Sequence, residues 1–221
     1  MNYDYFGSSL AVNNDVIAVG AMNKKIGTNS YQGCVYVFQK DESDRWYEKN
    51  ILVSPDGQQS DYFGSSLCVA DNYIVTCAAR EDGGTGDPSP DSGTAYIFKF
   101  DEQTGNWILS SIIRAPDNDK SDCFGTSAGI FNDLMVISAA YDDGDPESGN
   151  TNGGALYIYR HSSNGVWSFL KKMTSPDIQS YDYFGNSVAI HGNIVAAGAR
   201  GEDGGEGDPF KQSGAVYVIR F

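Results

Sequence analysis

The chain has 221 residues, of which 40% are hydrophobic and 13% aromatic, a composition typical of a folded protein rather than a disordered one. Its 29 Asp and Glu outnumber 15 Lys and Arg, and this net charge of −14 disfavours nucleic-acid binding. Cations or basic partner surfaces fit such a charge better, although solubility alone also explains it. No apolar run approaches the ~18 residues of a membrane helix, so we expect no membrane insertion of this segment.

Four similar decapeptides recur along the chain. "YDYFGSSLAV" begins at Tyr3, and related stretches begin at Ser60, Ser121 and Tyr181. The phenylalanines of their FG pairs lie 57, 61 and 60 residues apart, and a period of this size predicts a propeller, a solenoid or another array. We therefore interpret residues 1–221 as a single domain or segment with repeats at 3–60, 61–121, 122–181 and 182–221.

Each repeat spells the same elements in the same order. A short FG-x-S strand ("SSLAV") is followed by a polar turn ("NND"), a second strand ("VIAVGA") and a Gly/Asp-rich loop. A third strand ("GCVYVF"), a charged link and a fourth strand with a tryptophan ("RWYEKNILV") come next, and "SPD" or "APD" closes the period. The segments are short, rich in β-branched and aromatic residues, and bounded by turn residues, so each is predicted to be a strand.

Four strands in a meander per ~60 residues predict a blade of an all-β propeller. The small residues of the FG-x-S strand favour the crowded position at the axis, and the alternating fourth strand favours the outer edge. Up-and-down strands also place the loop before FG and the Gly/Asp-rich loop at the same end of the propeller.

The number of blades leaves two interpretations open. The sequence contains only three fourth strands, because Phe221 comes directly after the last third strand. The chain is therefore either a ring of about four four-stranded antiparallel blades whose last blade lacks its outer strand, or a segment of a larger propeller joined to further repeats of a longer chain. An unpaired outer edge is a liability, which favours the segment.

Three features together resemble the FG-GAP repeats of integrin α propellers: the FG pairs, the GA or AA ends of the second strands, and the tyrosines of the third strands. The resemblance covers essentially the whole chain and implies a binding or adhesion propeller, usually seven-bladed and extracellular or at the cell surface. It also implies ligand contacts on the end that carries the FG-side and GA-side loops. The matching residues are Phe6-Gly7, Phe63-Gly64, Phe124-Gly125 and Phe184-Gly185; Gly20-Ala21, Ala78-Ala79, Ala139-Ala140 and Gly198-Ala199; and Tyr36, Tyr96, Tyr157 and Tyr217.

Two departures from the family pattern stand out. The proline of GAP is absent from all four copies. The calcium loop that integrin-type repeats often carry between the first two strands is reduced here to a turn such as Asn13-Asn14-Asp15, which is too short to surround an ion with six or more oxygens. Calcium binding therefore does not carry over to those turns.

The acidic loops at 80–93, 141–154 and 200–214 are the candidate sites. Clustered carboxylates among glycines suit Ca²⁺, which takes oxygen ligands from flexible loops, although Gly-Asp-Pro clusters are also ordinary turn chemistry. The corresponding loop of the first repeat is basic, so the site is not fully repeated. The candidate metal ligands are Asp82, Asp87, Asp142, Asp143, Asp145, Asp203 and Asp208, and Asp91 and Glu202 join them as candidate partner-binding residues.

The loops before FG repeat a second set of acidic residues. Their favoured role is to cap turns and to accept hydrogen bonds from free amides at the strand starts. The residues are Asp56, Asp117 and Asp177, followed by Asp61, Asp122 and Asp182.

No catalytic constellation is evident. "GTSAG" at 125–129 matches G-x-S-x-G, but Ser127 falls inside a predicted strand, whereas a nucleophile elbow needs a strand, a sharp turn and a helix. His161 and His191 are predicted to be exposed loop residues with no activated serine in reach. We expect no enzyme activity from this segment.

Three tryptophans and four cysteines are predicted to be structural. Trp46, Trp107 and Trp167 recur at one strand position, which favours packing between blades over stacking on sugars. Cys68 is expected opposite Val75 rather than Cys77, so we predict four buried free thiols.

The sequence thus predicts a non-catalytic module that recognises a protein or glycan partner through its acidic loops. A purely structural segment of a large surface protein, or an accessory propeller of a larger secreted enzyme, are the alternatives. The first repeat starts at Tyr3, which leaves no room for a signal peptide in this segment.

Overall fold

The computed structural model describes residues 3–83, 86, 88–117, 119–144, 149–203 and 212–221. These residues form fifteen β-strands and no helix, in three four-stranded sheets and one three-stranded sheet, and every pairing between strands is antiparallel. The all-β propeller fold is therefore confirmed, with four blades.

Each sheet follows the chain order from its FG strand outward, as predicted. Sheet 1 contains β1 (Phe6–Asn13), β2 (Val16–Ala21), β3 (Cys34–Lys40) and β4 (Trp46–Leu52). Sheet 2 contains β5 (Phe63–Ala70), β6 (Tyr73–Ala78), β7 (Thr94–Asp101) and β8 (Asn106–Ile113). Sheet 3 contains β9 (Phe124–Phe131), β10 (Leu134–Ala139), β11 (Ala155–His161) and β12 (Trp167–Met173). Sheet 4 contains β13 (Phe184–His191), β14 (Ile194–Ala199) and β15 (Ala215–Arg220).

The strand register explains the repeated FG and GA pairs. Phe63 lies opposite Ala78, and the register then shifts before Ser66 pairs with Cys77, with Gly64 at a positive φ of 88° inside the irregularity. Ala78 and Ala139 are therefore the structural equivalents of Ala21 and Ala199. In the second and third repeats the residue that corresponds to the Ala of GA is thus the first alanine of the predicted AA pair, not the second.

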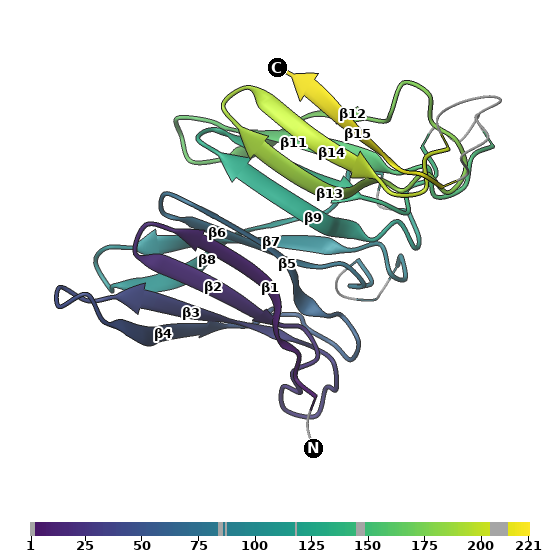
Figure 1. The fold of residues 1–221 in the computed structure, drawn as a ribbon. Coiled ribbons are helices and arrows are strands. Elements are labelled where there is room, and N and C mark those ends of the chain that lie inside the picture. Colours follow the sequence, from purple (N-terminus) through teal and green to yellow (C-terminus); the bar gives the residue numbers. More distant parts are fainter. Residues whose placement is uncertain (1–2, 84–85, 87, 118, 145–148, 204–211) are drawn as a thin grey trace.

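The four sheets are arranged as a fan, with sheet 1 at one end and sheet 4 at the other (Figure 1). The inner strand β5 packs between β1 and β9, and β13 packs on β9. Each of the three joints between sheets holds its own hydrophobic cluster, in which the FG phenylalanine of one sheet meets the third strand of the sheet before it. Phe63, Phe124 and Phe184 are almost fully buried in these clusters.

Backbone contacts also hold each joint, in an arrangement that we call the latch. At the first joint the amides of Tyr62 and Phe63 donate hydrogen bonds to the carbonyls of Tyr31 and Gln32, at 3.0 and 2.7 Å. A Cβ on Gly33 would lie 2.1 Å from the Phe63 carbonyl oxygen, so only glycine fits at the position directly after the two acceptor residues. The latch recurs with Asp91, Ser92 and Gly93 against Cys123 and Phe124, and with Asn152, Gly153 and Gly154 against Tyr183 and Phe184.

The structural tryptophans and cysteines largely follow prediction. Trp107 and Trp167 are buried in the joints, whereas Trp46 is 42% exposed because no sheet covers that side of sheet 1. Cys68 lies opposite Val75, as expected, and the thiols are free. The four cysteines are Cys34 and Cys77, which are buried, and Cys68 and Cys123, which are half-buried contrary to prediction.

The prediction for His161 was wrong. It ends β11, is half-buried, stacks on Trp167 and lies 3.2 Å from the Tyr73 hydroxyl across the second joint. Its aromatic neighbours hold it in the packing, whereas His191 at the end of β13 is exposed as expected. Nowhere in the described part of the chain is there a helix with the length and apolar character to cross a bilayer.

Candidate binding face

The loops before each FG pair and the loops after each second strand gather at one end of the fan, where the latches join them. We call this end the loop face. It comprises the described residues of 22–33, 54–62, 79–93, 114–123, 140–154, 174–183 and 200–214.

A hydrogen-bonded cluster repeats beneath the loop face. The third-strand tyrosine donates from its hydroxyl to an aspartate of the preceding SPD or APD segment: Tyr96 to Asp56 at 2.8 Å and Tyr217 to Asp177 at 2.6 Å. Burial, together with the neighbouring carboxylates, raises the pKa of these tyrosines, which therefore stay protonated and act as donors. The predicted turn-capping aspartates thus have a second role, as acceptors that anchor the third strands.

In sheets 2 and 3 a cation in the fourth strand, or directly after it, contacts the carboxylates of the cluster. In sheet 2, Arg114 contacts Asp56 at 3.2 Å and the buried Glu81 at 3.4 Å. In sheet 3, Lys172 lies 2.8 Å from both Asp117 and Asp142.

Two predicted partner-binding residues are consequently not available at the surface. Asp142 is 1% exposed and also accepts from the Tyr157 hydroxyl at 2.5 Å. Glu202, its equivalent in sheet 4, is 4% exposed, and no donor among the described residues reaches its Oε1. Both carboxylates belong to the interior of the cluster.

Three other predicted residues shape the loops themselves. Asp82 and Asp143 each accept a 2.8 Å hydrogen bond from a loop amide nine residues ahead, that of Asp91 and of Asn152. Asp203 does the same for Gln212. The residues whose amides are held adopt positive φ, so these carboxylates stabilise a left-handed turn. Asp143 is exposed.

The aspartates that precede FG in the last three repeats, Asp61, Asp122 and Asp182, are buried. Burial, and then the nearby carboxylates, raises the pKa of Asp122 to about 8. The pKa of Asp61 is raised to about 6 by burial, even though the Gln58 amide donates to it at 2.5 Å. Asp122 is therefore largely protonated at neutral pH.

The predicted calcium ligands do not gather in the part of the chain that is described. Among those residues no group of three or more His, Cys, Asp or Glu has a metal-binding arrangement. Asp82, Asp142, Asp143 and Asp203 are occupied by amides, a lysine and a tyrosine, which favours the turn interpretation for them. Asp87, Asp145 and Asp208 lie outside the described residues, so calcium binding by these loops stays a prediction.

Tyrosine and arginine side chains on the loop face were not singled out from the sequence. The Arg200 guanidinium lies over the Tyr183 ring, 4.4 Å from its centroid, and its Nη2 is 3.4 Å from the Tyr141 hydroxyl. Arg80 lies over Tyr62 at 5.5 Å in the same way. The available signal was the tyrosine directly before FG, in three of the four repeats, with an arginine following a second strand.

The G-x-S-x-G match has a structural explanation. Ser127 lies within β9, where its amide donates to the Ser138 hydroxyl at 3.0 Å and its own Oγ accepts from the Val188 amide at 3.1 Å. It therefore joins sheet 3 to sheet 4 and has no strand–turn–helix context.

Comparison with known families decides the assignment. The profile of the FG-GAP repeat matches residues 1–38, 46–98, 107–159 and 167–219, which is most of the chain. The chain belongs to the FG-GAP repeat family. Each complete FG-GAP match begins with the outer strand of one sheet and continues with the three inner strands of the next, so the sequence repeat links two blades.

Two similar proteins extend the comparison. The FG-GAP chain is 25% identical over 208 residues to human Integrin alpha-E, and this match covers 85% of the chain but only 16% of the integrin. Sqt1 from Chaetomium thermophilum has a similar fold, with a TM-score of 0.56 at 9% identity, over 99% of this chain and 44% of that one. Membership of the family indicates a protein-binding or structural role.

Proposed function

We propose that this FG-GAP chain is a non-catalytic binding or adhesion module that recognises a protein or glycan through its loop face, outside the cell or at its surface. The observation that carries the proposal is the combination of exposed arginines stacked on half-buried tyrosines with acidic loops at one end of the fan. Tyrosine and arginine are enriched at the energetic centres of protein interfaces. Aromatic rings also stack on sugars, which keeps both partner classes in the proposal.

The positions of the carboxylates determine which variants test it. Asp142 anchors the cluster under the face, so its charge reversal would unfold the protein rather than report on binding. Asp143 is exposed and Tyr183 carries the arginine stack, so these two are the informative positions.

The experiment is to probe the purified chain against a glycan array and a panel of basic proteins. Any hit should be weakened at least tenfold by Asp143→Lys or by Tyr183→Ala, since interface centres concentrate the binding free energy. Glu42→Lys, an equal charge change in the exposed link between β3 and β4, should leave binding unchanged. Equal binding by all three variants would contradict the loop face as the recognition surface.

A further inference from the structure

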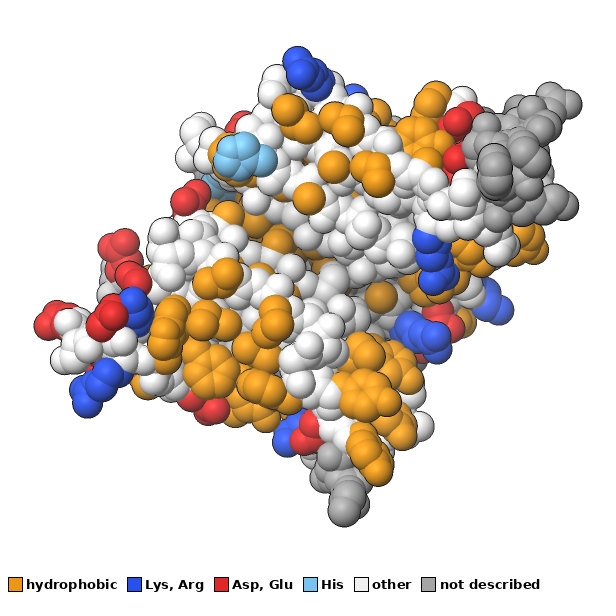
Figure 2. Space-filling model, viewed as in Figure 1, with side chains coloured by type: hydrophobic (Ala, Val, Ile, Leu, Met, Phe, Trp, Pro, Cys, Tyr) orange, Lys and Arg blue, Asp and Glu red, His pale blue; other side chains and the backbone are white. Residues whose placement is uncertain are grey.

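The two end sheets of the fan expose residues whose equivalents are buried at every internal joint. Phe6 is 58% exposed, whereas its equivalents Phe63 and Phe124 are 0% exposed. At the other end, Val216 and Val218 of β15 are 71% and 67% exposed, in place of the fully buried pairs that occupy the same positions in β3, β7 and β11. Figure 2 shows hydrophobic side chains gathered over the first sheet.

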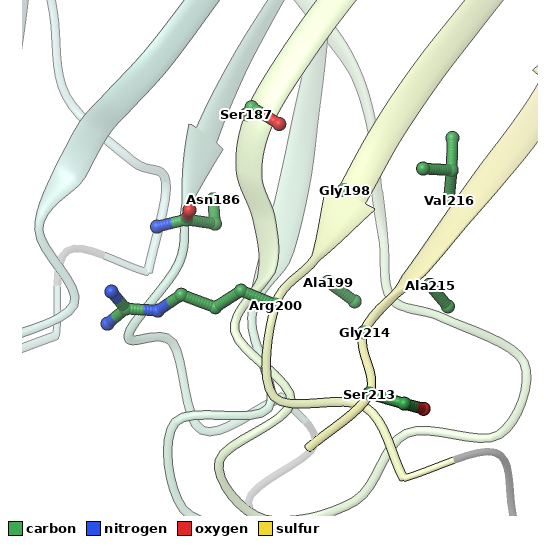
Figure 3. A pocket seen from close by; sticks show the side chains of 9 residues that line it. All are labelled: Asn186, Ser187, Gly198, Ala199, Arg200, Ser213, Gly214, Ala215 and Val216. Carbon is green, nitrogen blue, oxygen red and sulfur yellow. The ribbon is translucent and has the colours of Figure 1, made fainter. Parts of the chain in front are cut away.

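Sheet 4 contains an empty copy of the pocket that receives an FG pair. At the first joint Gly64 lies so close to Gly20, Cys34 and Val35 that a Cβ on it would be within 3.3 Å of all three. The equivalent residues of sheet 4 are Gly198, Ala215 and Val216, and they line a surface hollow together with Ser187 and Gly214 (Figure 3). Among the described residues, a Cβ on Gly214 would meet no atom closer than 3.4 Å, whereas a Cβ on a latch glycine of the other sheets would lie 2.1 to 2.2 Å from a phenylalanine carbonyl oxygen.

Both halves of a fourth latch are already in the latch conformation. Tyr5, which would donate, has a φ of 53°, close to the 58° of Tyr62 in the first latch. Gln212, which would accept, has a φ of 55°, close to the 59° of Tyr31. These two φ angles already match those of a formed latch, and such preorganisation reduces the entropy lost on association.

A hydroxyl group for the joint is also in place. At the first two joints a serine of the inner strand donates to the glycine carbonyl of the next FG pair: Ser9 to Gly64 at 2.6 Å and Ser66 to Gly125 at 2.8 Å. Ser187 is the corresponding residue of β13 and lines the hollow (Figure 3).

We propose that the chain associates head to tail with a second copy of itself, with Phe6-Gly7 of one copy seated in the hollow between β13, β14 and β15 of the other. At the three internal joints the equivalents of these two surfaces fit each other. The strand β1, which begins with Phe6-Gly7, and the strands β13, β14 and β15, which line the hollow, lie at opposite ends of the fan (Figure 1), so one copy supplies the FG pair and another supplies the hollow. The contact joins different surfaces of two identical chains, and such contacts either close into a ring or continue as a chain.

The test is the mass of the chain in solution, measured by light scattering after gel filtration and by sedimentation, up to about 100 µM, where a contact with a Kd at or below that value is populated. The mass should rise with concentration from 23.9 kDa to at least twice that value. Phe6→Asp and Val216→Asp should each keep the chain monomeric. Leu170→Asp, an equal change on the exposed face of β12, should associate like the unmodified chain.

A mixture of the two interface variants separates this contact from other association. Phe6→Asp retains the hollow and Val216→Asp retains the FG pair, so together they should form a complex of two chains and no larger species. Circular dichroism verifies that each variant folds, and Val218→Lys replaces Val216→Asp if Val216→Asp does not fold.

A monomer at every concentration, which would leave the end sheets to another occupant such as further repeats, overturns the proposal. So does association that neither variant weakens, or a mixture that forms no complex. The loop face is tested separately at Asp143 and Tyr183, which do not line the hollow.

Discussion

The Tyr157 hydroxyl lies 2.8 Å from a carboxylate oxygen of Asp117, 40 residues earlier in the chain. Tyr96 and Tyr217 repeat this bond with aspartates that are also 40 residues earlier. The bond ties the third strand of one blade to the segment that connects it to the blade before. Its regular spacing shows that the link between blades is part of the repeated unit.

The cation of this cluster should contribute measurably to stability. Burial opposes the charge on Asp117, yet Lys172 and Tyr157 together hold its pKa below the usual value. Lys172→Met would leave two carboxylates close together without a cation, and we expect the free energy of unfolding to fall by about 1–3 kcal/mol. Urea unfolding at neutral pH measures the loss. Lys120→Met, on an exposed lysine, should change it by less than about 0.5 kcal/mol, and an equal effect of both variants would contradict the prediction.

The latch glycines offer a matched pair of substitutions. Gly93 and Gly214 both have positive φ, 86° and 76°, but a Cβ on Gly93 would lie 2.1 Å from the Phe124 carbonyl oxygen, whereas the described backbone atoms nearest a Cβ on Gly214 are at an ordinary contact distance of 3.4 Å. Gly93→Ala should therefore lower the free energy of unfolding by about 3 kcal/mol or more, and Gly214→Ala by about 1 kcal/mol, from backbone strain alone. Urea unfolding at low protein concentration compares them. An equal loss of unfolding free energy in the two variants would show that the close approach of the Phe124 backbone does not restrict Gly93.

The buried Asp122 predicts a specific pH dependence. Its folded pKa of about 8 exceeds the ordinary carboxyl value of ~3.9, so between about pH 4 and pH 8 the folded state holds a proton that the unfolded state has lost. The free energy of unfolding should fall as pH rises through this window, by at most ~1.4 kcal/mol per pH unit. Asp122→Asn cannot titrate and should flatten the curve, measured by urea unfolding between about pH 5 and pH 8. Asp15→Asn, on an exposed turn, should run parallel to the unmodified chain, and a parallel curve for Asp122→Asn would disprove the assignment.

Strand order, blade architecture and local pairing could be read from the sequence. Cys68 was placed opposite Val75 from the turn alone, because a two-residue hairpin turn determines the register of the strands that it joins. The shift in strand register at the FG pair was not predicted from the sequence, because it depends on Gly64 adopting a positive φ where it meets the neighbouring sheet. The same limit explains Trp46, whose exposure depends on there being no sheet in front of it.

For the candidate site, the sequence by itself determined that acidic loops and FG-side loops share one end of the propeller, because alternating strands leave no other arrangement. Only the tertiary structure decided which carboxylates face outward: Asp142 is buried under Tyr157 and Lys172, while its neighbour Asp143 is exposed. Composition shows that charges cluster along the chain, but burial depends on side chains that arrive from strands 15 to 40 residues away. Such long-range contacts are made by packing between strands and blades, and no local pattern encodes them.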